Sequence, residues 1–316
     1  MLRKLLTLFV DPEHHRLRAL WRLLIHTLLL AVFGFVSLLV VQGSTGAPTS
    51  AWLFTLISAL LVVLPVTWLC GTRLDRRRFA DFGFHLDRRW WLDLGFGLTL
   101  GVVLMSAIFV IELELGWLDV RATKVVPEGF TGPFALAMVQ PLVLFLAVGF
   151  YEELLSRGYH LRNMAEGVTW RGRIDADAAL IIGTILSSTL FGLLHADNPN
   201  ATALSTINVA LAGGFLAIGV LTTGELAIPI GIHVTWNFCQ GNVFGFPVSG
   251  TDAGARFYAV EQSGDPLITG GQFGPEAGLI GVAAMLAGSA AILVWVKLTR
   301  GELRIHRELV QTGRRT

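Results

Sequence analysis

Long apolar runs separated by short polar segments dominate the sequence and predict helices that cross a membrane. A transmembrane helix needs about 20 apolar residues. Eight stretches reach or approach this length: Leu23–Gln42, Ala51–Cys70, Leu94–Ile111, Phe134–Tyr151, Ala178–Leu194, Ala201–Thr223, Leu226–Phe244 and Ala277–Val296. Because lipid offers backbone amides no water, these runs are expected to be helical, and they lack the alternation of an outer-membrane barrel. The sequence therefore predicts an all-α polytopic membrane protein with about eight transmembrane helices.

The composition and the distribution of charge support this fold class. Only 15% of the 316 residues are charged and the mean hydropathy is +0.63, whereas soluble domains carry about 25% charged residues. Of the 24 Lys and Arg residues, five lie in 1–22, six in 71–90, four in 157–175 and six in 297–316. With eight spans these segments fall on one side, which the positive-inside rule makes cytoplasmic. Both termini are therefore predicted to be cytoplasmic.

The chain is expected to form one membrane domain over residues 23–296. A basic cytoplasmic segment (1–22) precedes it and a basic cytoplasmic tail (297–316) follows it. The first apolar run lacks a small-residue cleavage site, so we interpret it as a retained span. No internal repeat is evident, which argues against an inverted-repeat transporter. The Gly-rich loop 245–274 is either a cap over a site or a loose connection.

Two adjacent carboxylates stand at the end of the fourth apolar run, in the stretch GFYEELLSRGYH (149–160). Ionisable residues in a span are costly and indicate a functional site by default. Glu153 and Arg157 are four residues apart, in the order that favours an ion pair on one helix face. Glu152 is rotated by about 100° from its neighbour and is left without an intrahelical partner, so it is a candidate general base. Alternatively, both glutamates only mark the end of the span.

Two further segments place polar residues in apolar surroundings. The fifth run ends in FGLLHADNP with His195, and the seventh contains HVTWN with His233 and Asn237. His233 and Asn237 are four residues apart and project from one helix face. A histidine can polarise water, and an amide can donate to a developing negative charge. Each alone could be a packing residue, but their combination with Glu152 on three helices favours a reaction site.

Glutamate and histidine together also raise the question of a metal. Zinc binds His nitrogen and carboxylate oxygen, so Glu152, His195 and His233 are candidate ligands for a divalent metal such as zinc. The HExxH signature of helical zinc sites is absent, and so are a GxSG serine turn and a GxGD aspartate motif. The residues alone leave the presence of a metal open.

The three segments resemble, in order, the motifs of one protein family. EELLSRG (152–158), FGLLH (191–195) and HVTWN (233–237) are similar to the EExxxR, FxxxH and HxxxN motifs of the CPBP family. These are the CAAX-protease and bacteriocin-processing proteins, also called Abi proteins. The close resemblance covers about residues 145–250, with a looser match at 73–101, and implies a catalytic core at about 134–245. Three motifs in order on separate spans form a specific signal.

The resemblance implies an intramembrane endopeptidase, of a family usually labelled metalloprotease. The implied roles are water activation for Glu152 with His195, oxyanion stabilisation for His233 with Asn237, and support for Glu153 with Arg157. Eukaryotic members of the family trim three residues from prenylated CaaX proteins. The expected partners are the lipid bilayer and a membrane protein or lipidated peptide as substrate, and no nucleic acid. The expected location is the bacterial cytoplasmic membrane.

Two other functions are compatible with these residues. One is a non-catalytic binding or immunity protein on the same scaffold, in which the polar cluster serves packing or peptide capture. The other, less favoured, is a proton-coupled transporter in which Glu152, His195 and His233 form a relay. The apolar runs alone place Glu152 at the inner end of the fourth span and His195 at the outer end of the fifth. These residues can meet only if the fourth helix continues to about Met164 and the fifth begins near Asp175.

Overall fold

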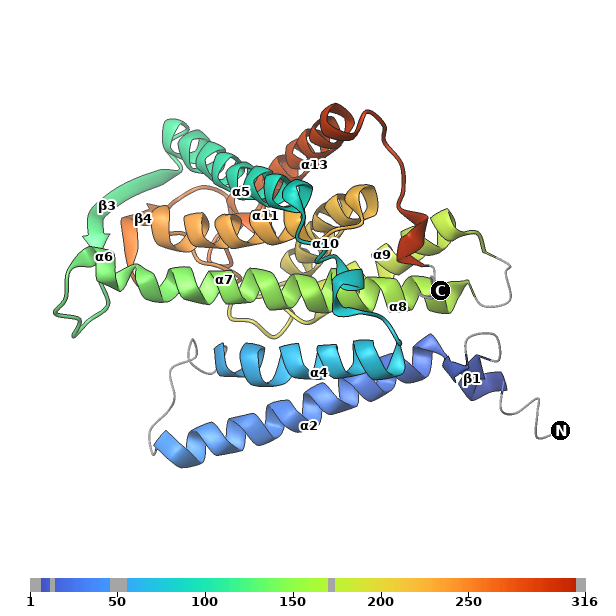
Figure 1. Cartoon of the computed structure of the whole chain (residues 1–316). Helices are drawn as coiled ribbons and strands as arrows, with labels where there is room; N and C mark the ends of the chain where they lie inside the picture. Colours follow the sequence, from blue (N-terminus) through green and yellow to red (C-terminus); the bar gives the residue numbers. More distant parts are fainter. Residues whose placement is uncertain (1–6, 12–14, 46–55, 170–173, 311–316) are drawn as a thin grey trace.

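The computed structural model describes residues 7–11, 15–45, 56–169 and 174–310, and these are largely helical (Figure 1). In these residues seven helices are long and apolar enough to cross a membrane: Ala19–Val41, Leu56–Leu74, Arg88–Glu114, Phe134–Val168, Ala176–Leu193, Ala203–Thr223 and Leu279–Arg300. They confirm the all-α polytopic fold class predicted from the apolar runs.

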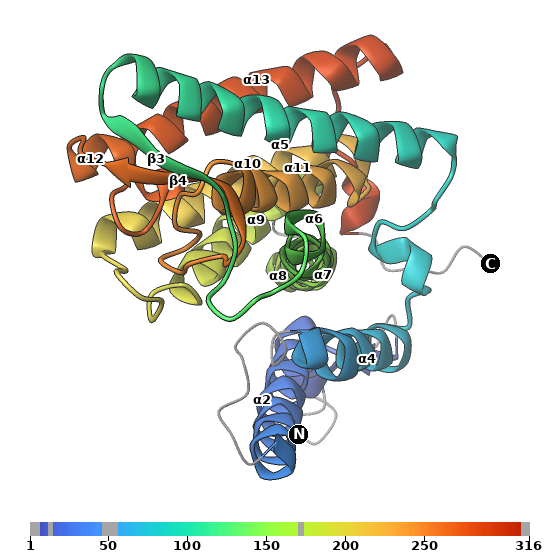
Figure 2. The ribbon, with the colours of Figure 1, turned by 90° about the vertical axis from the view of Figure 1, so that its left-hand side faces the viewer.

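The elements form layers around one long central helix. The N-terminal elements are β1 (Val10–Asp11), β2 (Arg16–Leu17), α2 (Ala19–Thr45), α4 (Leu64–Leu69), α5 (Arg88–Glu114) and β3 (Leu118–Val125). The central helix comprises α6 (Phe134–Ala137), α7 (Val139–Glu153) and α8 (Arg162–Val168). After it come α9 (Ala176–Leu193), α10 (Ala203–Thr223), α11 (Ala227–Phe238), β4 (Arg256–Gln262), α12 (Pro266–Thr269) and α13 (Leu279–Arg300). In both views α2 and α4 lie on one side of α7 and α8, and α5 and α13 on the other (Figures 1 and 2).

The central helix carries both glutamates and extends well past its apolar run. It continues through a π-helical segment, Leu154–Leu161, into α8 and ends at Val168. The next helix, α9, begins at Ala176, and the side chain of Asp175 caps it by accepting a hydrogen bond from the Ala178 amide at 2.9 Å. Both predicted extensions are therefore confirmed. They place Glu152 inside a helix rather than at its end.

The seventh predicted span differs from the observed helix. Instead of crossing over Leu226–Phe244, α11 covers Ala227–Phe238 and continues as a short π-helix, Cys239–Val243. Most of its side chains are buried against α5, α7 and α10. A Cβ atom on Gly97 of α5 would lie 2.4 Å from the Ile228 carbonyl oxygen, so the two backbones touch. The apolar residues of α11 therefore serve the protein interior, where a helix need not match the thickness of a bilayer.

A two-stranded antiparallel sheet, which the sequence analysis did not predict, lies at one end of the helices (Figure 2). β3 follows α5, and β4 lies within the loop 245–274, so that Leu118 pairs with Gln262 and Val125 with Arg256. The register shifts between Val120 and Ala122, which is a bulge in β3. The loop 245–274 is therefore not merely a loose connection, because the pairing of β4 with β3 anchors its middle.

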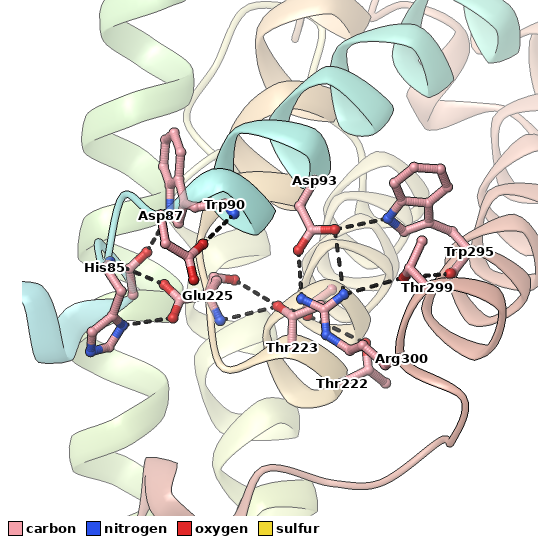
Figure 3. A network of polar contacts seen from close by, with 12 residues as sticks. His85, Asp87, Trp90, Asp93, Thr222, Thr223, Glu225, Trp295, Thr299 and Arg300 are labelled. Atoms are coloured by element: carbon pink, nitrogen blue, oxygen red, sulfur yellow. Dashed lines mark hydrogen bonds and ion pairs between the residues drawn. The ribbon is translucent and has the colours of Figure 1, made fainter.

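A buried ion pair joins α5 to α13 at the end of α5 farthest from the β3–β4 sheet (Figure 3). Asp93 is only 2% exposed. It accepts hydrogen bonds from the Arg300 guanidinium at 2.6 Å and from the Trp295 indole nitrogen at 2.8 Å. Nearby, His85 and Glu225 lie 2.6 Å apart and link the start of α5 to the connection between α10 and α11. These contacts hold three helix ends together.

We expect Asp93→Ala to lower the free energy of unfolding by about 3 kcal/mol or more, because removal of one partner leaves the other charge unpaired. The Arg300 side chain is 16% exposed, so water relieves part of that cost. Unfolding of the purified protein in detergent measures the change. Asp119→Ala is the matched control, since Asp119 forms an exposed pair with Arg121 and should matter little. Equal stability of the two variants would contradict the prediction.

Candidate active site

A cavity of about 300 Å³ lies between the central helix, α9, α10 and α11. Glu152, His195, His233 and Asn237 all line it, although they come from three separate segments of the chain. The rest of the wall is largely apolar and includes Phe145, Val148, Phe215, Ile232 and Met285. The structure therefore brings the four residues named from the sequence to one cavity with largely apolar walls. Electrostatic interactions are stronger in such surroundings than in water.

Glu153 lies behind this cavity wall rather than in it. Its side chain is fully buried, and its Oε1 accepts a hydrogen bond from the Arg157 guanidinium at 2.7 Å. The same oxygen lies 2.7 Å from Nδ1 of His233 on α11. The predicted pair at positions i and i+4 is thus present. It also holds a histidine that lies 80 residues away along the chain.

Arg157 has further contacts that fix its guanidinium. It donates to the Gly213 carbonyl oxygen of α10 at 3.1 Å. Its carbon Cζ stands 4.4 Å from the centre of the Phe191 ring, a cation–π contact. Arg157 therefore ties the central helix to α9 and α10 while it balances the charge of Glu153.

Glu152 points to the cavity and is less constrained than its neighbour. Its side chain is 18% exposed, and its Oε1 accepts a hydrogen bond from the Tyr151 hydroxyl at 3.1 Å. Its Oε2 lies 3.8 Å from Nε2 of His233, beyond hydrogen-bond distance. Glu152 thus keeps one oxygen available for chemistry.

The tautomers of both histidines follow from their partners. His195 lies just past the end of α9, with Nδ1 2.8 Å from the Phe191 carbonyl oxygen. A carbonyl only accepts, so Nδ1 carries the proton and Nε2 is left as an acceptor. His233 likewise donates from Nδ1, because the Glu153 oxygen that it contacts already accepts from Arg157. In their neutral forms both rings can therefore take up a proton at Nε2.

Several residues of the site were not singled out from the sequence. Tyr151, Asn198, Ser249, Asp252 and Glu276 also line the cavity. Asn198 follows His195 in the stretch HADNP and donates to the Ser249 carbonyl oxygen at 3.1 Å. Its position beside a candidate residue was a usable signal. Glu276 offered none, because it stands in a Gly-rich stretch far along the chain from the three motifs.

Glu276 is a second buried carboxyl group of the cavity. It accepts hydrogen bonds from the Ser249 amide at 2.7 Å and from the Gln240 side-chain amide. Gln240 in turn accepts from the Trp236 indole nitrogen at 2.9 Å. Burial raises the pKa of Glu276 to about 7, against the lowering effect of these hydrogen bonds. Glu276 thereby connects the short π-helix after α11 to the cap segment, residues 248–253, which lines the cavity.

The three candidate metal ligands, Glu152, His195 and His233, are not arranged to hold a metal ion. Among the described residues, no group of three or more His, Cys, Asp or Glu side chains lies close enough to hold a metal ion. Glu152 and His233 approach each other to 3.8 Å, but Nδ1 of His233 is engaged by Glu153 and His195 does not complete a triad with them. Within the described residues, these side chains therefore do not form a metal centre.

Comparison with known proteins agrees with the motifs. No curated protein and no solved structure matched the chain. One family model does match, described as type II CAAX prenyl endopeptidase Rce1-like, over residues 134–239. The match begins with the central helix and ends just past α11, so it includes every candidate residue from Glu152 to Asn237. The chain is thus an integral membrane protein that carries an Rce1-like domain at residues 134–239, consistent with the CPBP family.

Proposed function

We propose that this protein is an intramembrane endopeptidase in which Glu152 activates water for attack on a peptide bond. One observation carries the proposal. Four side chains of the Rce1-like domain that can accept protons or stabilise an oxyanion line a single cavity. A fixed ion pair behind the wall, Glu153 with Arg157, orients one of them, His233.

The reaction begins with a water held by Glu152 and Nε2 of His195. The Glu152 carboxylate accepts a proton from this water, and the resulting hydroxide attacks the carbonyl carbon of the substrate. The carbonyl π-electrons move to oxygen, which becomes an oxyanion. The intermediate collapses by breaking the C–N bond, and the protonated Glu152 returns its proton to the leaving amine. One water is consumed, and Glu152 is regenerated as a carboxylate.

His233 and Asn237 stabilise the oxyanion in this scheme. The Asn237 amide donates in any protonation state of the site. His233 donates from Nε2 only when it is an imidazolium, because Nδ1 is already committed to Glu153.

Asn237→Ala is expected to lower kcat by about 10²–10³, the usual effect of deleting one oxyanion donor. The Asn237 side chain lines the cavity rather than a contact between helices, so thermal stability should change little. Kinetics on the purified protein in nanodiscs, with a peptide that contains a scissile bond, would measure this. Asn237→Asp is the companion variant: it keeps the side-chain size but places a negative charge near the oxyanion and should be as poor. An unaltered kcat in both variants would remove Asn237 from the oxyanion site.

The proposed function is tested by comparing protein termini in membranes from cells that carry wild type or Glu152→Gln at matched levels. New termini in wild type that vanish in the variant are expected, and they would name the substrate as well. If the termini are identical while function in the cell still depends on Glu153 and Arg157, a binding or immunity role replaces the protease.

A further inference from the structure

The charges that face the cavity are one-sided. Glu152, Asp252 and Glu276 contribute carboxyl groups to its wall, and among the described residues no Lys or Arg lines it. The remaining titratable groups that face it are Tyr151, His195 and His233. Any ligand charge that enters this space therefore meets carboxylates first.

The neighbouring cations neutralise only part of this charge. Asp252, at the exposed mouth, lies 3.0 Å from the Arg256 guanidinium. Behind the wall, Arg157 is paired with Glu153. Within the described residues, neither Glu152 nor Glu276 forms an ion pair with a Lys or Arg side chain. These two carboxyl groups are thus the acidic features of the cavity that a ligand could satisfy.

Glu276 is placed as a feature of recognition rather than of bond cleavage. It lies in the short 3-10 turn before α13. It contacts the cap through Ser249 and the π-helix after α11 through Gln240. Its environment is rigid, because the cap is also held by Asn198 at 3.1 Å and by the Gly250 amide, which donates to the Phe273 carbonyl oxygen at 2.7 Å. A buried charge in a fixed setting discriminates strongly between ligands of opposite charge.

Resting on the proposed function, we infer that the substrate is a segment in which a Lys or Arg stands beside apolar residues, and that Glu276 is a specificity-determining residue for that basic side chain. The apolar wall takes the neighbouring residues, and the acidic part takes the cation.

The test is a binding measurement on the Glu152→Gln variant in phosphatidylcholine nanodiscs, so that it does not depend on cleavage. Three fluorescent peptides share an apolar sequence and differ at one position, which is Lys, Gln or Glu, with both ends blocked. We expect the Lys peptide to bind about tenfold more tightly than the Glu peptide, equivalent to about 1.4 kcal/mol. Empty nanodiscs give the background from lipid. Equal affinities would overturn the inference.

Adding Glu276→Gln to this background should remove most of the preference for Lys. Glu302→Gln is the matched control, because it makes the same change at an exposed residue outside the cavity and should leave the preference intact. A preference that survives Glu276→Gln unchanged would overturn the assignment of Glu276. Thermal unfolding shows whether the cap contacts of Glu276 have been lost with the charge.

The pH dependence provides a second reading that needs no new variant at Glu276. The pKa of Glu276 is raised to about 7 by burial, so the carboxyl is neutral below that pH and charged above it. The preference for Lys over Glu should therefore grow from pH 6 to pH 8. Tyr151, His195, His233 and Asp252 are the other titratable groups that face the cavity in this background, so the part due to Glu276 is measured by adding Glu276→Gln, which should make the growth smaller. A preference that is flat or falls with pH would overturn the inference.

The two proposals fail in different ways. If the Lys peptide is preferred but wild type never cleaves it, the endopeptidase reaction fails while the recognition stands. If wild type cleaves Lys, Gln and Glu peptides equally and in a Glu152-dependent manner, the reaction stands and the inferred substrate class fails.

Discussion

Glu152→Gln is expected to reduce kcat/KM for peptide cleavage by at least about 10³-fold, which corresponds to about 4 kcal/mol of transition-state stabilisation. General acid–base groups contribute typically about 10²–10⁴-fold. Glu152 is asked to act twice, as base toward water and as acid toward the leaving amine. Glutamine has nearly the same shape, but it cannot accept the proton. The loss should therefore appear in kcat rather than in KM.

The fold of this variant should survive. Glu152 is partly exposed, and the hydrogen bond that it accepts from the Tyr151 hydroxyl can be accepted equally well by the glutamine carbonyl. Thermal unfolding in detergent should give a midpoint close to that of wild type. Glu261→Gln is the matched control, since Glu261 is an exposed carboxylate of β4 that pairs with Arg121. Cleavage within about tenfold of wild type in Glu152→Gln would exclude Glu152 as the base.

Arg157→Ala is expected to lose both stability and activity, with a fall in the free energy of unfolding of about 3–5 kcal/mol. The Arg157 side chain is 2% exposed, and its removal leaves the fully buried Glu153 without the guanidinium that pairs with it. The contacts with Gly213 and Phe191 disappear as well. Because Glu153 would lose the cation that fixes its geometry, the orientation of His233 should loosen and cleavage should fall even in the fraction that remains folded.

Arg157→Lys separates charge from geometry. Lysine keeps a positive charge near Glu153 but lacks the planar fork that reaches Glu153 and Gly213 together. We expect stability between those of wild type and Arg157→Ala, with activity still strongly reduced. The double variant Glu153→Gln/Arg157→Ala should be less destabilised than the sum of its single changes, because no buried charge is left unpaired. Wild-type stability in Arg157→Ala would show that the pair has no structural role.

Glu152 and Glu153 illustrate how two adjacent carboxylates acquire different tasks. Their rotation by about 100° around the helix sends one toward the cavity and the other toward Arg157 and toward His233 of α11. Local geometry is sufficient for this separation. The sequence predicted this separation of the two carboxylates. It also predicted the pair formed by Glu153 and Arg157, because residues four apart lie on the same face of a helix.

His233 is the point at which local geometry was insufficient. Its spacing to Asn237 predicts that both share one face of a helix, and both do line the cavity. Its hydrogen bond to Glu153 joins residues 80 positions apart, and no periodicity contains that contact. Yet this bond determines which ring nitrogen is available to the substrate.

By itself, the sequence determined the features that depend on neighbouring residues: the helical membrane fold, the long central helix, the faces of Glu152 and Glu153, and the three motifs. Only the tertiary structure decided that α11 is buried, that β3 and β4 pair across the chain, and that Glu276 shares the cavity with Glu152. Apolar residues look alike in a run whether they face lipid or protein. Which of the two they face, and which distant polar groups come to lie beside them, depends on how the helices pack together.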